Sequence, residues 1–123
     1  MADAKHVVRE FCAAWESVDA ERILAFFTDD AVYHNIPMPP STGKDAIRGL
    51  LGFILGPAKS VKFDILHMAS DGDVVLNERV DTFEMKDGKT VTLRVMGAFE
   101  LRDGKIAAWR DYFDMAEWTR QTG

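Results

Sequence analysis

Residues 73–113, DVVLNERVDTFEMKDGKTVTLRVMGAFELRDGKIAAWRDYF, carry the clearest indication of the fold class. Stretches rich in strand-forming residues alternate here with turns that contain Asp87-Gly88 and Asp103-Gly104. Asp-Gly pairs supply the positive backbone φ angles that tight hairpins need. One more such stretch and turn come just before. The predicted strands of this meander are residues 60–68, 73–84, 90–101 and 105–113.

The first half of the chain shows helical periodicity instead. Apolar residues at i, i+1, i+4, i+5 and i+8 from Val7 to Trp15 predict an amphipathic helix. Thr42 and Asp45 have the spacing of a capping box and predict the start of another helix, which ends at Gly56-Pro57. Between them we expect a short helix over 23–27 and a short strand over 31–36. Helices followed by a strand meander indicate an α+β fold, with an antiparallel sheet curled around one helical layer.

Length and charge narrow the class of protein. At 123 residues the chain has the size of one domain, so 1–123 is interpreted as a single unit. It carries 15 Lys and Arg against 20 Asp and Glu, a formal net charge of -5, which argues against partners such as nucleic acid or an anionic membrane. The opening residues lack the apolar stretch of a signal peptide, so the cytoplasm is the expected compartment.

The sequence shows no pattern typical of a metal or cofactor site. The histidines His6, His34 and His67 have no ligand spacing with one another or with Cys12. Cys12 lies in the apolar stripe of the first helix and is expected to be buried filler. No phosphate-binding glycine-rich loop and no nucleophile elbow is present in the sequence. We therefore expect no metal and no cofactor.

Strand alternation places several polar side chains on faces that are otherwise apolar. These residues are Tyr33 and Asn35 in 31–36, Arg79 and Asp81 in 73–84, and Asp111 in 105–113. Burying such charges is costly unless they are paired. One interpretation is a salt bridge between Arg79 and Asp81 or a solvated outer face. The other is a pocket, because three separate strands bring polar groups beside aromatic ones.

The chemistry of such a pocket is restricted by its residue types: two carboxyls, one guanidinium, one phenol and one carboxamide, without an obvious nucleophile. An arginine between two carboxyls can separate their pKa values, so that one acts as base and the other as acid. A phenol and a carboxamide can orient a water molecule. This set suits acid–base hydrolysis.

At these same positions the sequence resembles the limonene-1,2-epoxide hydrolase family. The resemblance covers residues 7–118 and is strongest in VYHNIPMPP at 32–40, ERVD at 78–81, and GKI at 104–106 through WRDYFD at 109–114. It implies a cone-like curved mixed β-sheet packed against N-terminal helices, a fold shared with ketosteroid isomerases and polyketide cyclases. It also implies one-step opening of an epoxide to a vicinal diol, without a cofactor.

The resemblance further implies a role for each polar residue. Asp111 would deprotonate a water held by Tyr33 and Asn35, Asp81 would protonate the epoxide oxygen, and Arg79 would bridge the two carboxyls. A lipophilic, cyclic or aryl epoxide is the expected substrate, because the pocket walls are apolar and partly aromatic. The expected wall residues are Trp15, Ile54, Phe63, Phe83, Leu93, Val95 and Phe113. Met115 and Trp118 fit either a cover over this pocket or a surface tail.

Apolar residues on the opposite strand faces predict a second layer of cover. They are Val74, Leu76, Val80, Met96, Ala98, Ile106 and Ala108. A second copy of the chain would supply this cover, so we expect a homodimer, as the resemblance also implies. Three alternatives stay open: a related isomerase or cyclase, a non-catalytic module that binds small lipophiles, and a dimeric interaction domain.

Overall fold

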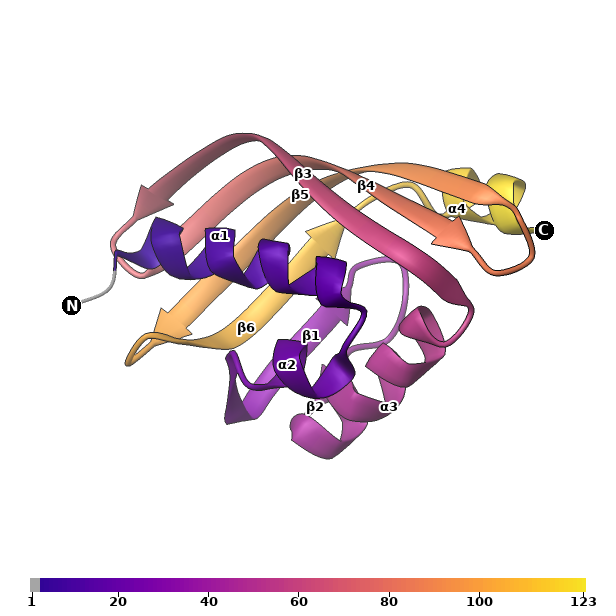
Figure 1. Cartoon of the computed structure of the whole chain (residues 1–123). Coiled ribbons are helices and arrows are strands. Elements are labelled where there is room, and N and C mark those ends of the chain that lie inside the picture. The colour runs from indigo at the N-terminus through magenta and orange to yellow at the C-terminus, as the bar shows by residue number, and fades with distance from the viewer. Residues whose placement is uncertain (1–2) are drawn as a thin grey trace.

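A computed structural model describes residues 3–123 of the chain (Figure 1). Four α-helices, one short 3-10 helix and six strands follow one another in these residues. The helices are α1 (Ala4–Ala14), η1 (Trp15–Ser17), α2 (Ala20–Leu24), α3 (Lys44–Leu55) and α4 (Met115–Thr122). The strands are β1 (Phe27–Asn35), β2 (Ser41–Thr42), β3 (Ala58–Asp71), β4 (Val74–Met85), β5 (Thr90–Arg102) and β6 (Lys105–Tyr112). No helix in the described part is long and apolar enough to cross a membrane.

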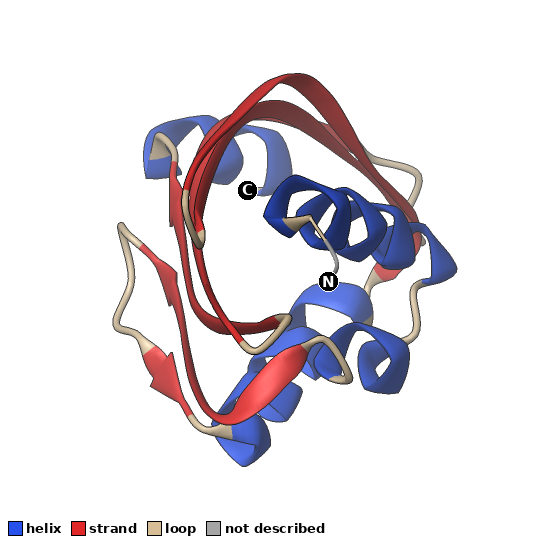
Figure 2. Cartoon of the chain, turned by 90° about the vertical axis from the view of Figure 1, so that its left-hand side faces the viewer, coloured by secondary structure: helices blue, strands red, loops and turns tan. Residues whose placement is uncertain are grey.

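All six strands form one mixed sheet in the order β2-β1-β6-β5-β4-β3. The meander from β3 to β6 is antiparallel, as the turn sequences predict. β1, in contrast, pairs with β6 in parallel, so an entirely antiparallel sheet is wrong and the mixed sheet is confirmed. Figure 2 shows the sheet bent around α1, with α2 and α3 closing the open side. The result is the α+β cone with N-terminal helices.

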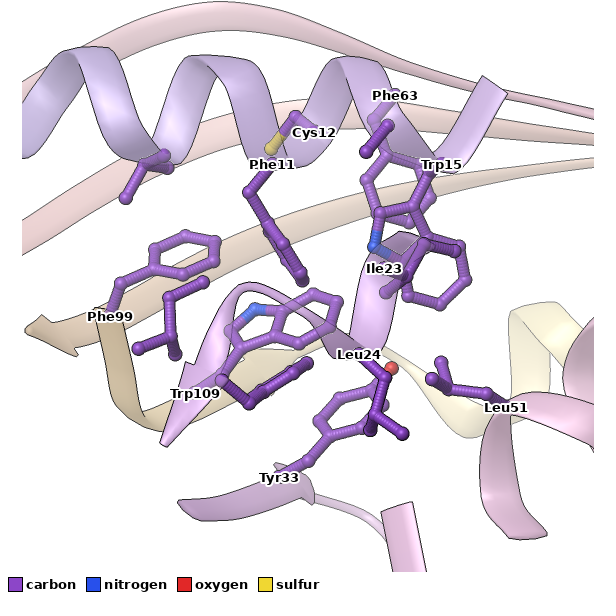
Figure 3. Close-up of a cluster of buried hydrophobic side chains, with 14 of the residues drawn as sticks. Phe11, Cys12, Trp15, Ile23, Leu24, Tyr33, Leu51, Phe63, Phe99 and Trp109 are labelled. Carbon is purple, nitrogen blue, oxygen red and sulfur yellow. The ribbon is translucent and has the colours of Figure 1, made fainter. Parts of the chain in front are cut away.

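The concave side of the sheet holds the core. Phe11 of α1 lies at its centre and makes edge-to-face contacts with Trp109 at 4.9 Å and with Phe27 at 5.5 Å between ring centroids (Figure 3). The inward residues of β5 are buried as their alternation predicts. Each large side chain buried here stabilises the fold by roughly 1.5–3 kcal/mol.

Several local predictions are wrong, each for a physical reason. The helix expected over 23–27 ends at Leu24, and β1 begins at Phe27 rather than at 31, because Phe27 pairs with Ile106 of β6. Thr42 does not cap α3: it belongs to β2, and the N-cap is Gly43, whose φ of 88° suits glycine.

Simple alternation also places Ile106 on the outer face of the sheet, which is wrong. The β5–β6 register shifts between Glu100 and Leu101, so Ile106 pairs with Leu101 and turns inward. Its side chain is fully buried in the core instead of lying on the outer face. A bulge of this kind reverses the facing of residues on its far side and adds to sheet curvature.

The C-terminal helix α4 covers one end of the cone. Asp114 caps it by accepting a hydrogen bond from the amide of Ala116 at 3.0 Å. Trp118 packs edge-to-face on Phe83 of β4, with 5.4 Å between ring centroids. Of the two interpretations of residues 115–118, the cover is the one that the structure bears out.

Candidate active site

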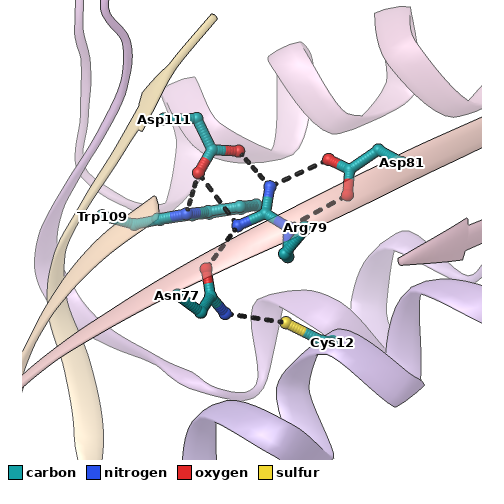
Figure 4. A network of polar contacts seen from close by, with 6 residues as sticks. All are labelled: Cys12, Asn77, Arg79, Asp81, Trp109 and Asp111. Atoms are coloured by element: carbon teal, nitrogen blue, oxygen red, sulfur yellow. Dashed lines mark hydrogen bonds and ion pairs between the residues drawn. The ribbon is translucent and has the colours of Figure 1, made fainter. Parts of the chain in front are cut away.

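A single guanidinium joins the polar residues of three strands. Arg79 of β4 is completely buried and donates to Asp81 twice, from Nε to Oδ1 at 3.0 Å and from Nη2 to Oδ2 at 2.8 Å. It donates to Asp111 of β6 twice as well, from Nη2 to Oδ2 at 2.8 Å and from Nη1 to Oδ1 at 3.2 Å (Figure 4). The sequence-based salt bridge between Arg79 and Asp81 therefore exists, but as half of a shared bridge.

The strand register explains why these residues meet. One row of paired positions crosses the sheet from Asn35 of β1 to Asp111 of β6, then to Gly97 of β5 and Asn77 of β4. Directly opposed residues in neighbouring strands point to the same face. Arg79 lies two residues beyond Asn77, on the same inward face. Arg79 and Asp111 thus converge because β4, β5 and β6 pair in this register, and Asn35 joins them because β1 adds to β6.

Burial and charge set the protonation of the site. Burial raises the pKa of Asp81 to about 6; the Arg79 guanidinium opposes this shift, and the Asp111 carboxylate adds to it. Burial also raises the pKa of Tyr33 well above its usual range, with a further contribution from Asp111. Burial alone would lower the pKa of Arg79, but the two carboxylates hold it well above its usual value. The site combines a permanent cation, a phenol that stays protonated, and one carboxyl that titrates near neutral pH.

The oxygens of Asp111 have different surroundings. Trp109 donates from Nε1 to Oδ1 at 2.7 Å, and Arg79 donates to the same oxygen. Among residues 3–123, Oδ2 accepts from Arg79 alone. The indole of Trp109 is itself fixed by Tyr33, whose ring stacks on it with 4.2 Å between ring centroids and an angle of 5° between the ring planes. Oδ2 therefore keeps more acceptor capacity for a further partner.

A partly open cavity lies above the two carboxyls. Every predicted site residue lines it except Arg79, which lies beneath its floor. The polar lining residues are Tyr33, Asn35, Asp81 and Asp111, and the predicted apolar ones are Trp15, Ile54, Phe63, Phe83, Leu93, Val95 and Phe113. The cavity thus has one polar end and otherwise apolar walls.

Sequence reasoning missed four residues of the site. Met38 and Phe53 belong to the cavity wall, Asn77 binds the guanidinium, and Trp109 binds Asp111. Met115 and Trp118, which the sequence offered as a possible cover, line the cavity as well. Asn77 shared the inward face of Arg79 in the sequence, which is the one signal that could have found it. Within residues 3–123 no cluster of three or more His, Cys, Asp or Glu side chains is arranged to hold a metal ion.

Comparison with known proteins agrees with this architecture. The SnoaL-like domain family matches residues 8–109. The chain is similar to an LEH-like epoxide hydrolase of M. tuberculosis, with 31% identity and a TM-score of 0.82 over 96% of this chain and 87% of that one. A putative polyketide cyclase of Xanthomonas campestris is similar at 23% identity and a TM-score of 0.85, over 98% of this chain and 96% of that one.

A third solved structure is an epoxide hydrolase/cyclase-like enzyme of pyran ring formation in the polyether salinomycin. It is 20% identical, with a TM-score of 0.83 over 93% of this chain and 92% of that one. At these lower identities the second and third likenesses show the fold alone. The fold is the ketosteroid-isomerase-like cone, which epoxide hydrolases and cyclases share.

Proposed function

The chain belongs to the SnoaL-like domain family, and from this premise and the geometry of its site we propose that it is an epoxide hydrolase. Its substrate is a lipophilic cyclic or aryl epoxide, which it opens to a vicinal diol in one step. The observation that carries the proposal is the shared guanidinium. Arg79 binds Asp81 and Asp111 at 2.8 Å each, and both carboxyls face one apolar cavity.

In this reaction Asp111 takes a proton from a water that Tyr33 and Asn35 orient. The water oxygen attacks an epoxide carbon while the carbon–oxygen bond breaks, and Asp81 gives its proton to the leaving oxygen. The raised pKa of Asp81, about 6, leaves a usable protonated fraction near neutral pH. After each turnover Asp111 holds a proton that Asp81 lacks, and the guanidinium stabilises whichever carboxyl is charged.

Identity to the LEH-like epoxide hydrolase supports the assignment, and the apolar walls support a neutral substrate. An isomerase of the same fold is the alternative. An isomerase needs a base and a donor that stabilises an oxyanion. Its reaction requires no proton transfer between the base and that donor. The common cation between Asp81 and Asp111 favours the hydrolase, because there the base must return its proton to the acid.

Diol formation from limonene oxide, cyclohexene oxide and styrene oxide tests the proposal. Asp111→Asn keeps the Arg79–Asp81 pair but removes the base, so we expect the rate to fall by roughly 10²–10⁴. Asp103→Asn is the matched control, because Asp103 is exposed in a turn at φ 53°, which asparagine tolerates. We expect it to behave as wild type.

Solvent labelling then tests the one-step mechanism. In a single turnover in ¹⁸O-water, direct attack by water puts the label into the diol at once, whereas a covalent enzyme ester would give unlabelled diol first. The proposal is wrong if no epoxide of the panel is opened, or if Asp111→Asn retains the wild-type rate while folded.

A further inference from the structure

One donor of Arg79 is bound by neither carboxyl. A guanidinium has five N–H donors, and four of the five hydrogen bonds of Arg79 go to Asp81 and Asp111. The fifth runs from Nη1 to Oδ1 of Asn77 at 3.1 Å. Figure 4 shows Asn77 at the end of the guanidinium that points away from Asp81. The buried cation is therefore fully satisfied only with Asn77 present.

Asn77 differs chemically from the other two acceptors. Its side chain is 1% exposed and does not line the cavity, so it contacts no substrate. Its amide does not titrate, and hence accepts from Nη1 in the same way whichever carboxyl is charged. Behind it, Nδ2 makes a long contact of 3.9 Å with Sγ of Cys12, its one polar partner in the part of the chain that the structure describes. Asn77 thus offers Arg79 an anchor that is independent of protonation.

Gly97 leaves the space that this arrangement needs. It is paired with Asn77 on one side and with Asp111 on the other. A Cβ atom at this position would lie 2.5 Å from Nη1 of Arg79, 2.8 Å from Oδ1 of Asn77 and 3.0 Å from Oδ1 of Asp111. Any side chain here would push Nη1 out of its place between two acceptors.

We propose that Asn77, with the space that Gly97 leaves, is a positioning residue that holds the Arg79 guanidinium in place while a proton moves between Asp111 and Asp81. This rests on the proposed hydrolase function. During turnover the negative charge shifts from Asp111 to Asp81. A guanidinium bound by these two carboxyls alone would move with the charge, toward Asp81 and away from Asp111. A third acceptor whose charge does not change keeps the guanidinium within hydrogen-bonding distance of both carboxyls. Each carboxyl can then regain its hydrogen bonds to Arg79 without a rearrangement of the site.

Asn77→Leu tests the kinetic consequence, because leucine has the same branched shape but no acceptor. We expect kcat to fall by roughly 10- to 100-fold, as for small misplacements of reacting groups, with KM little changed. Val8→Ala is the matched control. Val8 is fully buried in the core and does not line the cavity, so its truncation should lower thermal stability while leaving kcat as in wild type.

Nitrogen NMR of the arginine side chain tests the positioning directly and needs no substrate. In wild type we expect separate, slowly exchanging Nη1 and Nη2 signals for Arg79, and in Asn77→Leu we expect these signals to broaden or merge. This readout separates the two proposals. A protein that opens no epoxide but shows the NMR change disproves the hydrolase and keeps the anchor.

Gly97→Ala provides an independent variant if Asn77→Leu does not fold. Its methyl group displaces Nη1, so it should give the same spectral change and the same loss of kcat. Averaged Nη signals in the wild-type protein would overturn the proposal without any variant. So would an Asn77→Leu protein with wild-type kcat and Nη signals and only a loss of stability like that of Val8→Ala.

Discussion

Asp81 is the residue whose titration has the most direct consequence for activity. Its proposed role as acid requires the protonated form, and burial raises its pKa to about 6. The titratable or charged groups around it are Arg79 on its own strand, Asp111 on β6, Tyr33 on β1 and Cys12 on α1. Burial raises the pKa of the Cys12 thiol to about 12, so neither it nor Tyr33 changes charge between pH 5 and 8.

We therefore expect kcat/KM to fall as the pH rises through about 6, approaching a tenfold loss per pH unit. The profile of kcat/KM against pH, fitted on its alkaline side, measures this. Asp81→Asn should lose most of its activity, and its remaining kcat/KM should no longer fall as the pH rises through about 6. If the fall persists in Asp81→Asn, it belongs to the titration of another group.

The raised pKa of Asp81 also makes the free energy of unfolding depend on pH. The pKa of Asp81 is higher in the folded state than its usual value of 3.8, so the folded state binds more protons between these limits. The stabilisation is present below pH 3.8 and is lost as the pH rises through about 6. Comparing the unfolding free energies of wild type and Asp81→Asn across this window isolates the contribution of Asp81.

At the scale of elements, alternation within strands predicted most of the site, because a period of two fixes which residues share a face. Arg79, Asp81 and Asp111 were found in this way. Pairing between strands was not predictable from the same pattern. Phe27 fits a helical stripe as well as a strand, and only its distant partner Ile106 makes it a strand residue. Asn77 binds Arg79 and Trp109 binds Asp111 at a spacing of two residues on one strand, so alternation already placed each pair on one face. What alternation could not show is that Arg79 and Asp111 meet across the sheet.

Helix α4 was missed because none of its residues is fully buried and its apolar side is short, formed mainly by Met115 and Trp118. Besides the packing of Trp118, an amide pair holds it. Gln121 accepts from the amide of Thr92 and donates to the carbonyl of Thr92, both at 2.8 Å. The last β5–β6 pair is Met96 with Tyr112, so Gln121 takes over the β5 edge where β6 has ended.

Gln121→Ala should accordingly loosen α4 without unfolding the sheet. Loss of these hydrogen bonds, which are solvent-exposed, costs about 1 kcal/mol locally. We expect the Thr92 amide to exchange with deuterium at least several-fold faster, and the melting temperature to change little. Exchange measured by NMR at Thr92 checks this, with Thr119→Ala on the exposed side of α4 as control. Unchanged protection of Thr92 would show that Trp118 and Phe83 hold the helix by themselves.

At the scale of the whole molecule, the outer face of the sheet keeps an apolar surface. The residues on or beside it that remain exposed are Leu66, Val74, Leu76, Met96 and Tyr112, each between 36% and 48% accessible. Met96 and Tyr112 are paired in the ladder, and Leu76 is paired with Ala98 on the neighbouring strand. Several large apolar side chains exposed on one sheet face are typical of protein–protein contacts. We propose that a second copy of the chain covers it, so that two cones pack through their sheets.

Leu76→Glu tests this homodimer. In a two-fold symmetric contact each copy presents the same surface, so one substitution buries two carboxylates in the interface. We expect wild type to sediment at twice the mass of one chain at micromolar concentration and Leu76→Glu to sediment as a monomer. Gly49→Glu is the control, because it adds the same charge at an open, exposed position on α3.

A wild-type monomer, or a dimer that survives Leu76→Glu, would show that this face is not the interface. Arg79, Asp81 and Asp111 all belong to one chain, so the monomeric variant should still bind substrate on the concave side of its sheet.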